Sequence, residues 1–265
     1  MFDSYNREIT YLRISVTDRC NLACMYCMPE QVKSVERRSI LEFEEITEIV
    51  RDLVPLGISK IRLTGGEPLV RKGLDELVGM ISGIDGIREI TMTTNGQLLA
   101  GMAERLVSAG LDRVNISLDT LDRERYREIT RGGDIRRVFK GIEAAIMAGL
   151  NPVKLNCVIT PDTTPGEIEE LKEFNRLQDL EIRFIRQMNL VAGKFWKVEG
   201  GEGGHCRICN RIRLTADGRF VPCLFSEKDY HIKEYGIQGA FTRAIQNKPE
   251  RGSVNSRNTF YSIGG

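Results

Sequence analysis

Residues 89–118, EITMTTNGQLLAGMAERLVSAGLDRVNISL, predict a strand, a helix and a second strand in succession. The outer segments, 89–94 and 112–118, are rich in strand-forming residues, and apolar residues recur at helical spacing over 98–108 between them. Two strands joined through a helix lie parallel in one sheet, because the crossing segment returns the chain to its starting edge. This stretch therefore predicts a parallel sheet covered by helices.

The same alternation continues on both sides of this unit. Further strands are predicted over 11–17, 60–64, 152–159 and 181–185, and further helices over 41–54, 73–81, 136–148 and 167–177. Repeated βα units of this kind indicate an α/β fold. The periodicity is compatible with two architectures, a doubly wound sheet and an open part of a (βα)8 barrel.

Composition narrows the classes of function. The chain of 265 residues has 38 Lys and Arg against 37 Asp and Glu, and neither a basic stripe nor an aromatic platform predicts nucleic-acid binding. No apolar run is long enough for a membrane span, and the polar first ten residues do not predict a signal peptide, so we expect a cytoplasmic protein. In that reducing compartment, seven cysteines predict metal ligation rather than disulfides.

Glycines and polar residues follow several of the predicted strands. In both candidate architectures the chemistry lies at the carboxyl ends of the strands, so we expect a site at that edge. The residues that come just after a strand are Cys20, Gly65-Gly66, Thr93-Thr94-Asn95, Ser117 and Gln187-Met188.

Three cysteines follow the first strand with the spacing C-x3-C-x2-C, namely Cys20, Cys24 and Cys27. Three thiolates this close in sequence can hold one [4Fe–4S] cube and leave its fourth iron without a protein ligand. Such an open position lets a small molecule bind the metal directly. The alternative is a structural zinc site completed by His205 or His231, the two histidines of the chain.

This motif resembles that of the radical S-adenosylmethionine (SAM) superfamily, and the TGGEP turn over 64–68 is similar to one that contacts SAM there. The resemblance implies an open, partial (βα)6 TIM-like barrel with a C-terminal iron–sulfur cluster region. It also implies that the reduced cluster on the first three cysteines cleaves SAM to a 5′-deoxyadenosyl radical. The residues that it assigns to SAM are Tyr26 and Met188 at the adenine, Ser117 at the ribose and Gly66 at the methionine group.

A second group of three cysteines, Cys206, Cys209 and Cys223, has the spacing C-x2-C-x13-C. It too lacks an obvious fourth ligand. On spacing alone, a zinc knuckle that uses one of the two histidines and a second iron–sulfur cluster are equally compatible with the pattern.

The residues around this second group, CNRIRLTADG and PCL, resemble the GTP 3′,8-cyclase family of molybdenum cofactor biosynthesis. The resemblance implies a second [4Fe–4S] cluster whose open iron binds the guanine of GTP. Neighbouring arginines suit the triphosphate, because guanidinium forks bind phosphate oxygens bidentately. The residues that match the family's nucleotide contacts are Arg13, Arg62, Thr93, Lys154, Arg211, Ile212 and Arg213.

The activity implied by this resemblance is the cyclisation of GTP to (8S)-3′,8-cyclo-7,8-dihydroguanosine 5′-triphosphate, which begins with hydrogen abstraction at C3′. An electron donor, a homodimer and a cyclic pyranopterin monophosphate synthase that takes the product are implied as partners. The Gly264-Gly265 end is expected to reach into the site. Two other hypotheses stay open here, a radical SAM enzyme that modifies a peptide and a non-catalytic zinc-binding module.

The chain is expected to have two parts, a radical SAM partial barrel over 1–190 and an auxiliary cluster and substrate-binding region over 191–265. The segment 189–205 is shorter than is usual in the family that the chain resembles. The polar tail over 248–265 is predicted to be flexible unless a site captures it. Cys157 has apolar neighbours in a predicted strand and is expected to be a core residue.

Overall fold

The computed structural model describes residues 1–28, 35–257 and 259–263, and these residues form a nine-stranded sheet. The order of strands across the sheet is β6-β5-β4-β3-β2-β1-β7-β8-β9. The strands are β1 (Tyr11–Ser15), β2 (Lys60–Thr64), β3 (Glu89–Thr94), β4 (Arg113–Ser117), β5 (Lys154–Ile159), β6 (Glu181–Arg186), β7 (Arg211–Leu214), β8 (Arg219–Val221) and β9 (Tyr230–His231).

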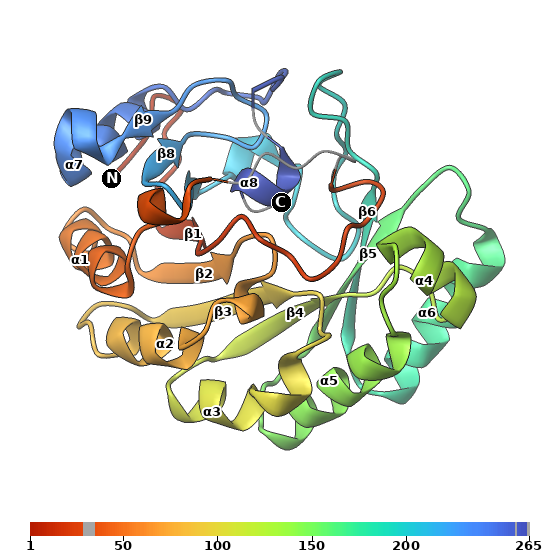
Figure 1. The fold of residues 1–265 in the computed structure, drawn as a ribbon. Helices are drawn as coiled ribbons and strands as arrows, with labels where there is room; N and C mark the ends of the chain where they lie inside the picture. The colour runs from red at the N-terminus through yellow and green to blue at the C-terminus, as the bar shows by residue number, and fades with distance from the viewer. Residues whose placement is uncertain (29–34, 258, 264–265) are drawn as a thin grey trace.

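The first six strands are parallel neighbours, as the βα units predict, and β7 is added in parallel on the free side of β1. The last two strands run antiparallel. Figure 1 shows the sheet curving around an interior, with α1, α2, α3, α5 and α6 along its outer side. Since the helices of the barrel cover one face of the sheet rather than both, the fold is an open partial barrel and not a doubly wound sheet.

Eight α-helices are present in the described residues. They are α1 (Phe43–Leu53), α2 (Leu74–Ser82), α3 (Ala103–Ser108), α4 (Arg123–Thr130), α5 (Ile135–Met147), α6 (Pro165–Leu177), α7 (Ile232–Gln246) and α8 (Phe260–Ile263). Short 3-10 turns lie at Arg37–Ser39, Pro68–Val70, Leu99–Gly101 and Cys206–Ile208. The predicted barrel helices agree with these bounds to within a few residues, apart from the two cases that follow.

Helix α4 was not predicted from the sequence, because it has few apolar residues to set a helical period. It is fixed instead by its start and by a small buried face. The Asp122 carboxylate accepts a hydrogen bond from the backbone N–H of Arg125, which caps the first turn. Tyr126 and Ile129 are buried. The helix therefore depends on a cap and on tertiary packing, which periodicity does not reveal.

The helix predicted over 98–108 is divided into the turn Leu99–Gly101 and helix α3. The interruption is at Met102, whose φ of −132° is not helical. Glycine at position 101 has low helix propensity, which weakens the segment at this point. The single-helix prediction for this segment is therefore wrong in its first turn.

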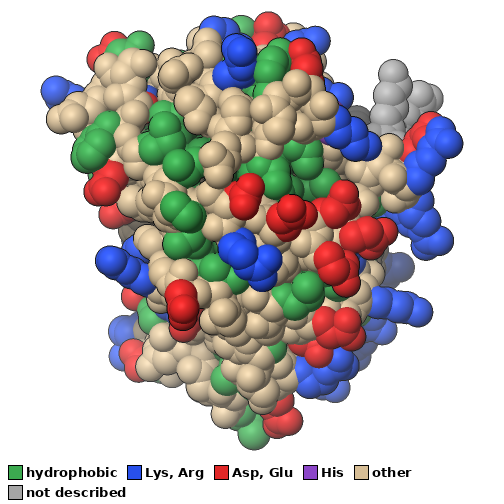
Figure 2. Space-filling model, turned by 90° about the vertical axis from the view of Figure 1, so that its left-hand side faces the viewer, with side chains coloured by type: hydrophobic (Ala, Val, Ile, Leu, Met, Phe, Trp, Pro, Cys, Tyr) green, Lys and Arg blue, Asp and Glu red, His purple; other side chains and the backbone are tan. Residues whose placement is uncertain are grey.

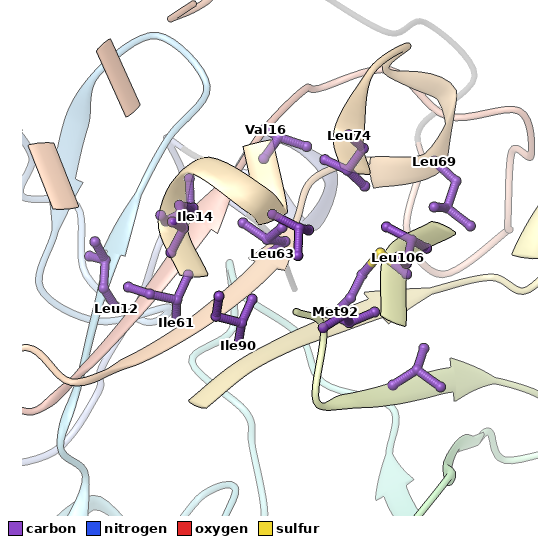
Figure 3. Close-up of a cluster of buried hydrophobic side chains, with 14 of the residues drawn as sticks. Leu12, Ile14, Val16, Ile61, Leu63, Leu69, Leu74, Ile90, Met92 and Leu106 are labelled. Atoms are coloured by element: carbon purple, nitrogen blue, oxygen red, sulfur yellow. The ribbon is translucent and has the colours of Figure 1, made fainter. Parts of the chain in front are cut away.

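The core lies between the sheet and the outer helices. Alternate side chains of three adjacent strands point to the helices, as Figure 3 shows for Leu12, Ile14, Ile61, Leu63, Ile90 and Met92. Each of these side chains is at most 2% exposed, and burying one stabilises the fold by about 1.5–3 kcal/mol. The intervening residues of the same strands, such as Arg13 and Arg62, face the interior of the barrel and are polar.

Cys157 is fully buried in this core, as expected. On the face shown in Figure 2, several acidic side chains gather from the centre toward the right-hand side, and a Lys or Arg side chain in the middle of the view stands apart from the other basic ones. None of the described helices is both long enough and apolar enough to cross a membrane. The basic residues that matter for binding are therefore sought in the interior of the barrel.

Candidate active site

A cavity of about 710 Å³ occupies the interior of the partial barrel. All six cysteines of the two groups line it, together with every other predicted site residue except Ile212. Ten Lys and Arg side chains line the cavity against four Glu, in a chain whose net charge is only +1. The structure thus gathers residues from both halves of the chain into one electropositive space, which suits an anionic ligand.

The two cysteine groups lie at opposite ends of the strands. The first group follows β1, so it is at the carboxyl end of the parallel sheet. Cys209 comes just before β7, which is parallel to β1, and is therefore at the amino end. Cys223 follows β8, which runs back along β7, and lies at the same amino end. The first group therefore lies at the carboxyl ends, where the site was expected, and the second lies at the opposite ends.

Hydrogen bonds within the loop of the first group hold its three cysteines close together. The backbone N–H groups of Cys27 and Met28 both donate to the carbonyl oxygen of Cys24, at 3.0 and 2.9 Å. The sulfur of Cys20 accepts from the backbone N–H of Leu22 at 3.4 Å and from the Asn95 amide at 3.7 Å. Burial raises the pKa of all three thiols, that of Cys27 to about 12, so they need a bound metal to become thiolates.

The TGGEP turn holds this loop by backbone contact. Gly66 donates to the carbonyl oxygen of Thr17, and Glu67 donates to that of Arg19, both at 2.7 Å. A Cβ atom at Gly66 would lie 2.3 Å from the Arg19 carbonyl oxygen, so only glycine permits the approach. The glycine was predicted as a SAM contact, and the structure adds that it fastens the cysteine loop to β2.

The carboxylate of Glu67 is buried, and it accepts hydrogen bonds from its own turn and from the end of β3. It accepts from the backbone N–H of Leu69 at 3.0 Å, from the Thr94 hydroxyl at 2.7 Å and from the backbone N–H of Asn95 at 2.7 Å. Burial raises its pKa to about 7 in spite of these donors. Glu67 therefore connects the ends of β2 and β3 beneath the first cysteine group.

A second buried acid, Asp119, fixes the aromatic residue of the cysteine motif. Its carboxylate accepts from the Tyr26 hydroxyl at 2.7 Å and from the backbone N–H of Val158 at 2.8 Å. Burial raises the pKa of Asp119 to about 6. Sequence analysis missed this residue, although it comes two positions after the predicted ribose contact Ser117. The acid ties Tyr26 to β5 and sets the orientation of its ring.

The second cysteine group is surrounded by cations. The ammonium of Lys248 is 3.4 Å from the sulfur of Cys209. Although burial alone would raise the pKa of Cys209, Lys248 and Arg211 bring it below its usual range. Burial dominates at Cys223 and raises the pKa of that thiol. The environment of Cys209 therefore favours negative charge, whereas burial prevails at Cys223 as it does in the first group.

Arginines of three adjacent strands lie side by side between the two groups. Arg13 of β1 is in register with Arg62 of β2 on one side and with Arg213 of β7 on the other. Burial and mutual repulsion lower the pKa of Arg13, and burial lowers that of Arg213 to about 10. Three guanidinium groups on adjacent strands thus place a row of positive charge in the cavity, which favours an anionic ligand.

Two donors in the cavity have no hydrogen-bond partner among the described residues. They are the Thr93 hydroxyl and the Nε of Arg183, both buried. Buried donors are almost always paired in folded proteins, so these two indicate a missing ligand or water. Thr93 was predicted as a nucleotide contact. Arg183 was not, although its place on the polar face of the predicted strand 181–185 was a usable signal.

Lys154 forms an ion pair with Glu181 of the neighbouring strand, at the end of the cavity near the second cysteine group. Glu89 pairs in the same way with Lys60 and Arg113. These carboxylates neutralise part of the cationic lining at the amino ends of the strands. The predicted role of Lys154 in nucleotide binding therefore requires it to share its ammonium with Glu181.

Ile212 does not line the cavity. Side chains alternate along β7, so Arg211 and Arg213 face the interior and Ile212 points to the opposite side, where it is fully buried in the core. The Ile212 side chain therefore has a packing role, and the assignment of this residue to the nucleotide stays a prediction.

The C-terminal tail is held against the site rather than left free. Helix α8 lies at the mouth of the curved sheet in Figure 1, and Phe260 lines the cavity. The Arg213 guanidinium donates to the carbonyl oxygen of Ile263 at 3.2 Å. The predicted role of Gly264-Gly265 concerns residues outside the described part of the chain.

The spacing of the possible ligands bears on whether each cysteine group holds a single zinc ion or a cluster. Among the described residues, no three His, Cys, Asp or Glu side chains are close enough together to hold one metal ion. A [4Fe–4S] cube binds each cysteine through a different iron, so its ligands stand further apart. The ring nitrogen Nδ1 of His231 caps α7 by accepting from the Lys233 N–H at 3.0 Å. That histidine is thereby tied to the helix start, which weakens the zinc alternative.

Comparison with known proteins identifies the family and the relatives that the chain resembles. Residues 14–174 match the profile of the Radical SAM superfamily. A GTP 3′,8-cyclase of Alkaliphilus oremlandii is 42% identical, with 95% of this chain and 94% of that protein aligned. One of Clostridium botulinum is 37% identical over the full length of both chains. That alignment extends over 319 positions, so at least 54 of them have no residue in this chain of 265.

Solved structures share the fold at low sequence identity. Streptococcus suis SuiB with bound S-adenosylmethionine superimposes with a TM-score of 0.70 at 18% identity, covering 86% of this chain and 64% of SuiB. The anSMEcpe protein with bound AdoMet superimposes with a TM-score of 0.65 at 16% identity, covering 91% of this chain and 81% of that one. These similarities support the open barrel.

Proposed function

The chain belongs to the radical SAM superfamily and, within it, to the GTP 3′,8-cyclases, and we propose that it cyclises GTP in the cavity between its two cysteine groups. The product is (8S)-3′,8-cyclo-7,8-dihydroguanosine 5′-triphosphate, an early intermediate of molybdenum cofactor biosynthesis. The observation that carries the proposal is the single cavity itself, which has a cysteine group at each end and a row of arginines between them.

Cys20, Cys24 and Cys27 would hold the first [4Fe–4S] cluster, and SAM would bind at its open iron. The bound pair supplies one-electron cleavage of a sulfonium and thereby hydrogen-atom abstraction. The chain's own contribution is to attract and orient the cationic cofactor. The carboxylate of Asp119 favours positive charge at this end of the cavity and fixes Tyr26, while Glu67 and Gly66 keep the cysteine loop in place.

The row of arginines would bind the triphosphate. Arg13, Arg62 and Arg213 lie on adjacent strands, so their guanidinium groups can reach neighbouring phosphate oxygens at once. The anion would also neutralise the mutual repulsion that lowers the pKa of Arg13. Thr93 and Arg183 would donate the hydrogen bonds that they lack among the described residues. Binding of the nucleotide therefore completes an unfinished polar network.

Cys206, Cys209 and Cys223 would hold a second [4Fe–4S] cluster, which would present an open iron to the guanine at the amino end of the barrel. Guanine at this end and SAM at the other would place the ribose between them, next to the arginine row. On this proposal, residues 1–190 supply the SAM half of the site and 191–265 supply the nucleotide half. Positioning and exclusion of water, rather than a general base, would govern the first step.

Partners and location follow from the proposed activity. The reaction needs an electron donor for the first cluster, and a cyclic pyranopterin monophosphate synthase would consume the product. A homodimer and a cytoplasmic location, where the clusters are protected from oxidation, complete the proposal.

The test is anaerobic turnover of the reconstituted protein with SAM, a reductant and GTP. We expect 5′-deoxyadenosine and the cyclised nucleotide to form together, and about eight irons per chain if both clusters are present. Deoxyadenosine without a cyclised nucleotide would reject GTP as the substrate. Zinc without iron in anaerobically purified protein would reject the radical mechanism altogether.

A further inference from the structure

We propose that Lys248 is a positioning residue of the second cysteine group, whose buried ammonium donates a hydrogen bond to the sulfur of Cys209 and raises the reduction potential of the cluster bound there. The inference rests on the proposed second cluster. It concerns a residue outside the cysteine motif, in the segment that follows α7.

The ammonium of Lys248 is surrounded by acceptors. Its Nζ lies 3.4 Å from the sulfur of Cys209, 2.7 Å from the carbonyl oxygen of Arg211 and 3.0 Å from that of Pro222. An ammonium has three protons, and these three acceptors use all of them. Lys248 therefore differs from the arginines of the cavity, because it has no donor left for a phosphate oxygen.

Lys248 links the segments that carry two of the three cysteines of the second group, Cys209 and Cys223. Arg211 begins β7 two residues after Cys209, and Pro222 directly precedes Cys223. By donating to both backbones, the ammonium holds the two cysteine-bearing segments at a fixed separation. The same ammonium then has its third donor directed at a sulfur.

The burial of the Lys248 ammonium indicates that it has a negatively charged partner. Lys248 is only 3% exposed, and a buried cation needs a compensating negative charge. None of the hydrogen-bond acceptors found for Lys248 in the described part of the chain is a carboxylate. The sulfur of Cys209 is the one acceptor of the three that can carry a full negative charge.

The N-terminal segment keeps Lys248 in place. Arg7 is buried, and its guanidinium donates to the carbonyl oxygens of Pro249 at 2.7 Å, Glu250 at 3.0 Å and Cys206 at 2.6 Å. Asp3 accepts from its Nε at 2.6 Å. The residues that follow Lys248 are thus fastened to the backbone of a cluster ligand, which restrains the lysine backbone from a distant part of the sequence.

The chemical consequence is a shift in redox behaviour. Hydrogen bonds to cluster sulfurs and nearby positive charge stabilise the reduced, more negative state of an iron–sulfur cluster. Removing the ammonium should therefore lower the reduction potential of the second cluster. Because Lys248 contacts the second group, the first cluster should keep its potential.

The experiment isolates the second cluster by replacing Cys20, Cys24 and Cys27 with Ala in the full chain, followed by anaerobic reconstitution. Potentiometric titration followed by EPR then compares Lys248→Met, Lys248→Arg and the parent. Lys228→Met is the matched control, because Lys228 is exposed and its Nζ donates to Asn247 at 2.9 Å, away from the cysteines.

We expect Lys248→Met to lower the midpoint potential by an amount that corresponds to a tenfold change in the reduction equilibrium, about 59 mV for one electron. Lys248→Arg should recover part of the shift because it keeps the charge, and Lys228→Met should match the parent. Loss of the cluster in Lys248→Met, with retention in Lys248→Arg and Lys228→Met, would support the same role through iron content and the EPR signal.

An unchanged potential in Lys248→Met would overturn the inference. Equal effects of the Met and Arg replacements would also overturn it, because the charge would then be irrelevant. A parent protein with intact Lys248 that shows no iron–sulfur signal points to a different failure, since in that case the proposed second cluster is itself wrong. Circular dichroism of every variant separates these outcomes from unfolding.

Discussion

The two cysteine groups contain the same number of thiols but differ in the charged residues beside them. The first is accompanied by the buried acids Glu67 and Asp119, and burial raises the pKa of all its thiols. The second is accompanied by Lys248 and Arg211, and the pKa of Cys209 falls. The difference suits the proposed ligands, because SAM would bring a sulfonium to the first group and the triphosphate of GTP would lie at the arginine row.

The largest expected effect separates the two groups by function. Cys24→Ala should abolish 5′-deoxyadenosine, because the cofactor loses its site. Cys223→Ala should spare part of the cofactor cleavage and abolish the cyclised nucleotide. Chromatography of both products in one anaerobic assay measures the split. If the two variants behave alike, the division of labour between the two ends of the cavity is wrong.

The next largest effect tests the arginines that line the cavity. Arg213→Ala should raise the KM for GTP about 10- to 100-fold, since a hydrogen bond to a charged group contributes about 1.5–3 kcal/mol. Arg211→Ala should have a smaller effect, because Arg211 is less buried and donates to the carbonyl oxygen of Glu202. Arg176→Ala, on the exposed face of α6, is the control and should leave the KM unchanged. Equal values for all three variants would remove the arginines from the site.

The two buried acids beside the first cysteine group, Glu67 and Asp119, should make the stability of the fold depend on pH. The pKa of Glu67 is raised to about 7 and that of Asp119 to about 6 in the folded chain. The unfolded chain therefore releases these protons first, and the free energy of unfolding should fall, by on the order of 5 kcal/mol, as the pH rises from about 4 to 7.

Urea denaturation of the cluster-free, reduced protein across this range measures the slope. Glu67→Gln should make the slope of the free energy of unfolding against pH shallower, because glutamine does not titrate. The matched control is Glu170→Gln, on exposed helix α6, which should keep the slope of the parent. A stability that rises over the same pH range would contradict the assigned direction of both shifts.

The smallest expected effect concerns the orientation of the cofactor. Asp119→Asn should weaken the hydrogen bond from Tyr26 and lower the affinity for SAM about fivefold, since one such bond contributes about 1 kcal/mol. The affinity for GTP should not change, because Asp119 is at the SAM end. Equilibrium binding of each ligand, with the exposed Asp162→Asn as control, checks the result. A loss of GTP affinity without a loss of SAM affinity would contradict the assignment of Asp119 to the SAM end of the cavity.

The sequence predicted much of the fold because the deciding signals are local. Strand alternation along segments such as 89–94 and helical spacing along 41–54 depend on neighbouring residues, and both appear in the structure near their expected bounds. The cysteine motifs and the TGGEP turn are local as well. Helix α4 escaped prediction because its evidence is a cap and two buried contacts rather than a period.

What the tertiary structure decided is how distant segments meet. Strand β7 pairs with β1 across some 200 residues, and this register sets Arg213 beside Arg13 and turns Ile212 away from the cavity. The same pairing carries Cys209 to the amino end of the barrel, and the segment after α7 packs there with Lys248 against its sulfur. No local pattern encodes such contacts, because strand order and register depend on which edges of the sheet stay free once the barrel has formed.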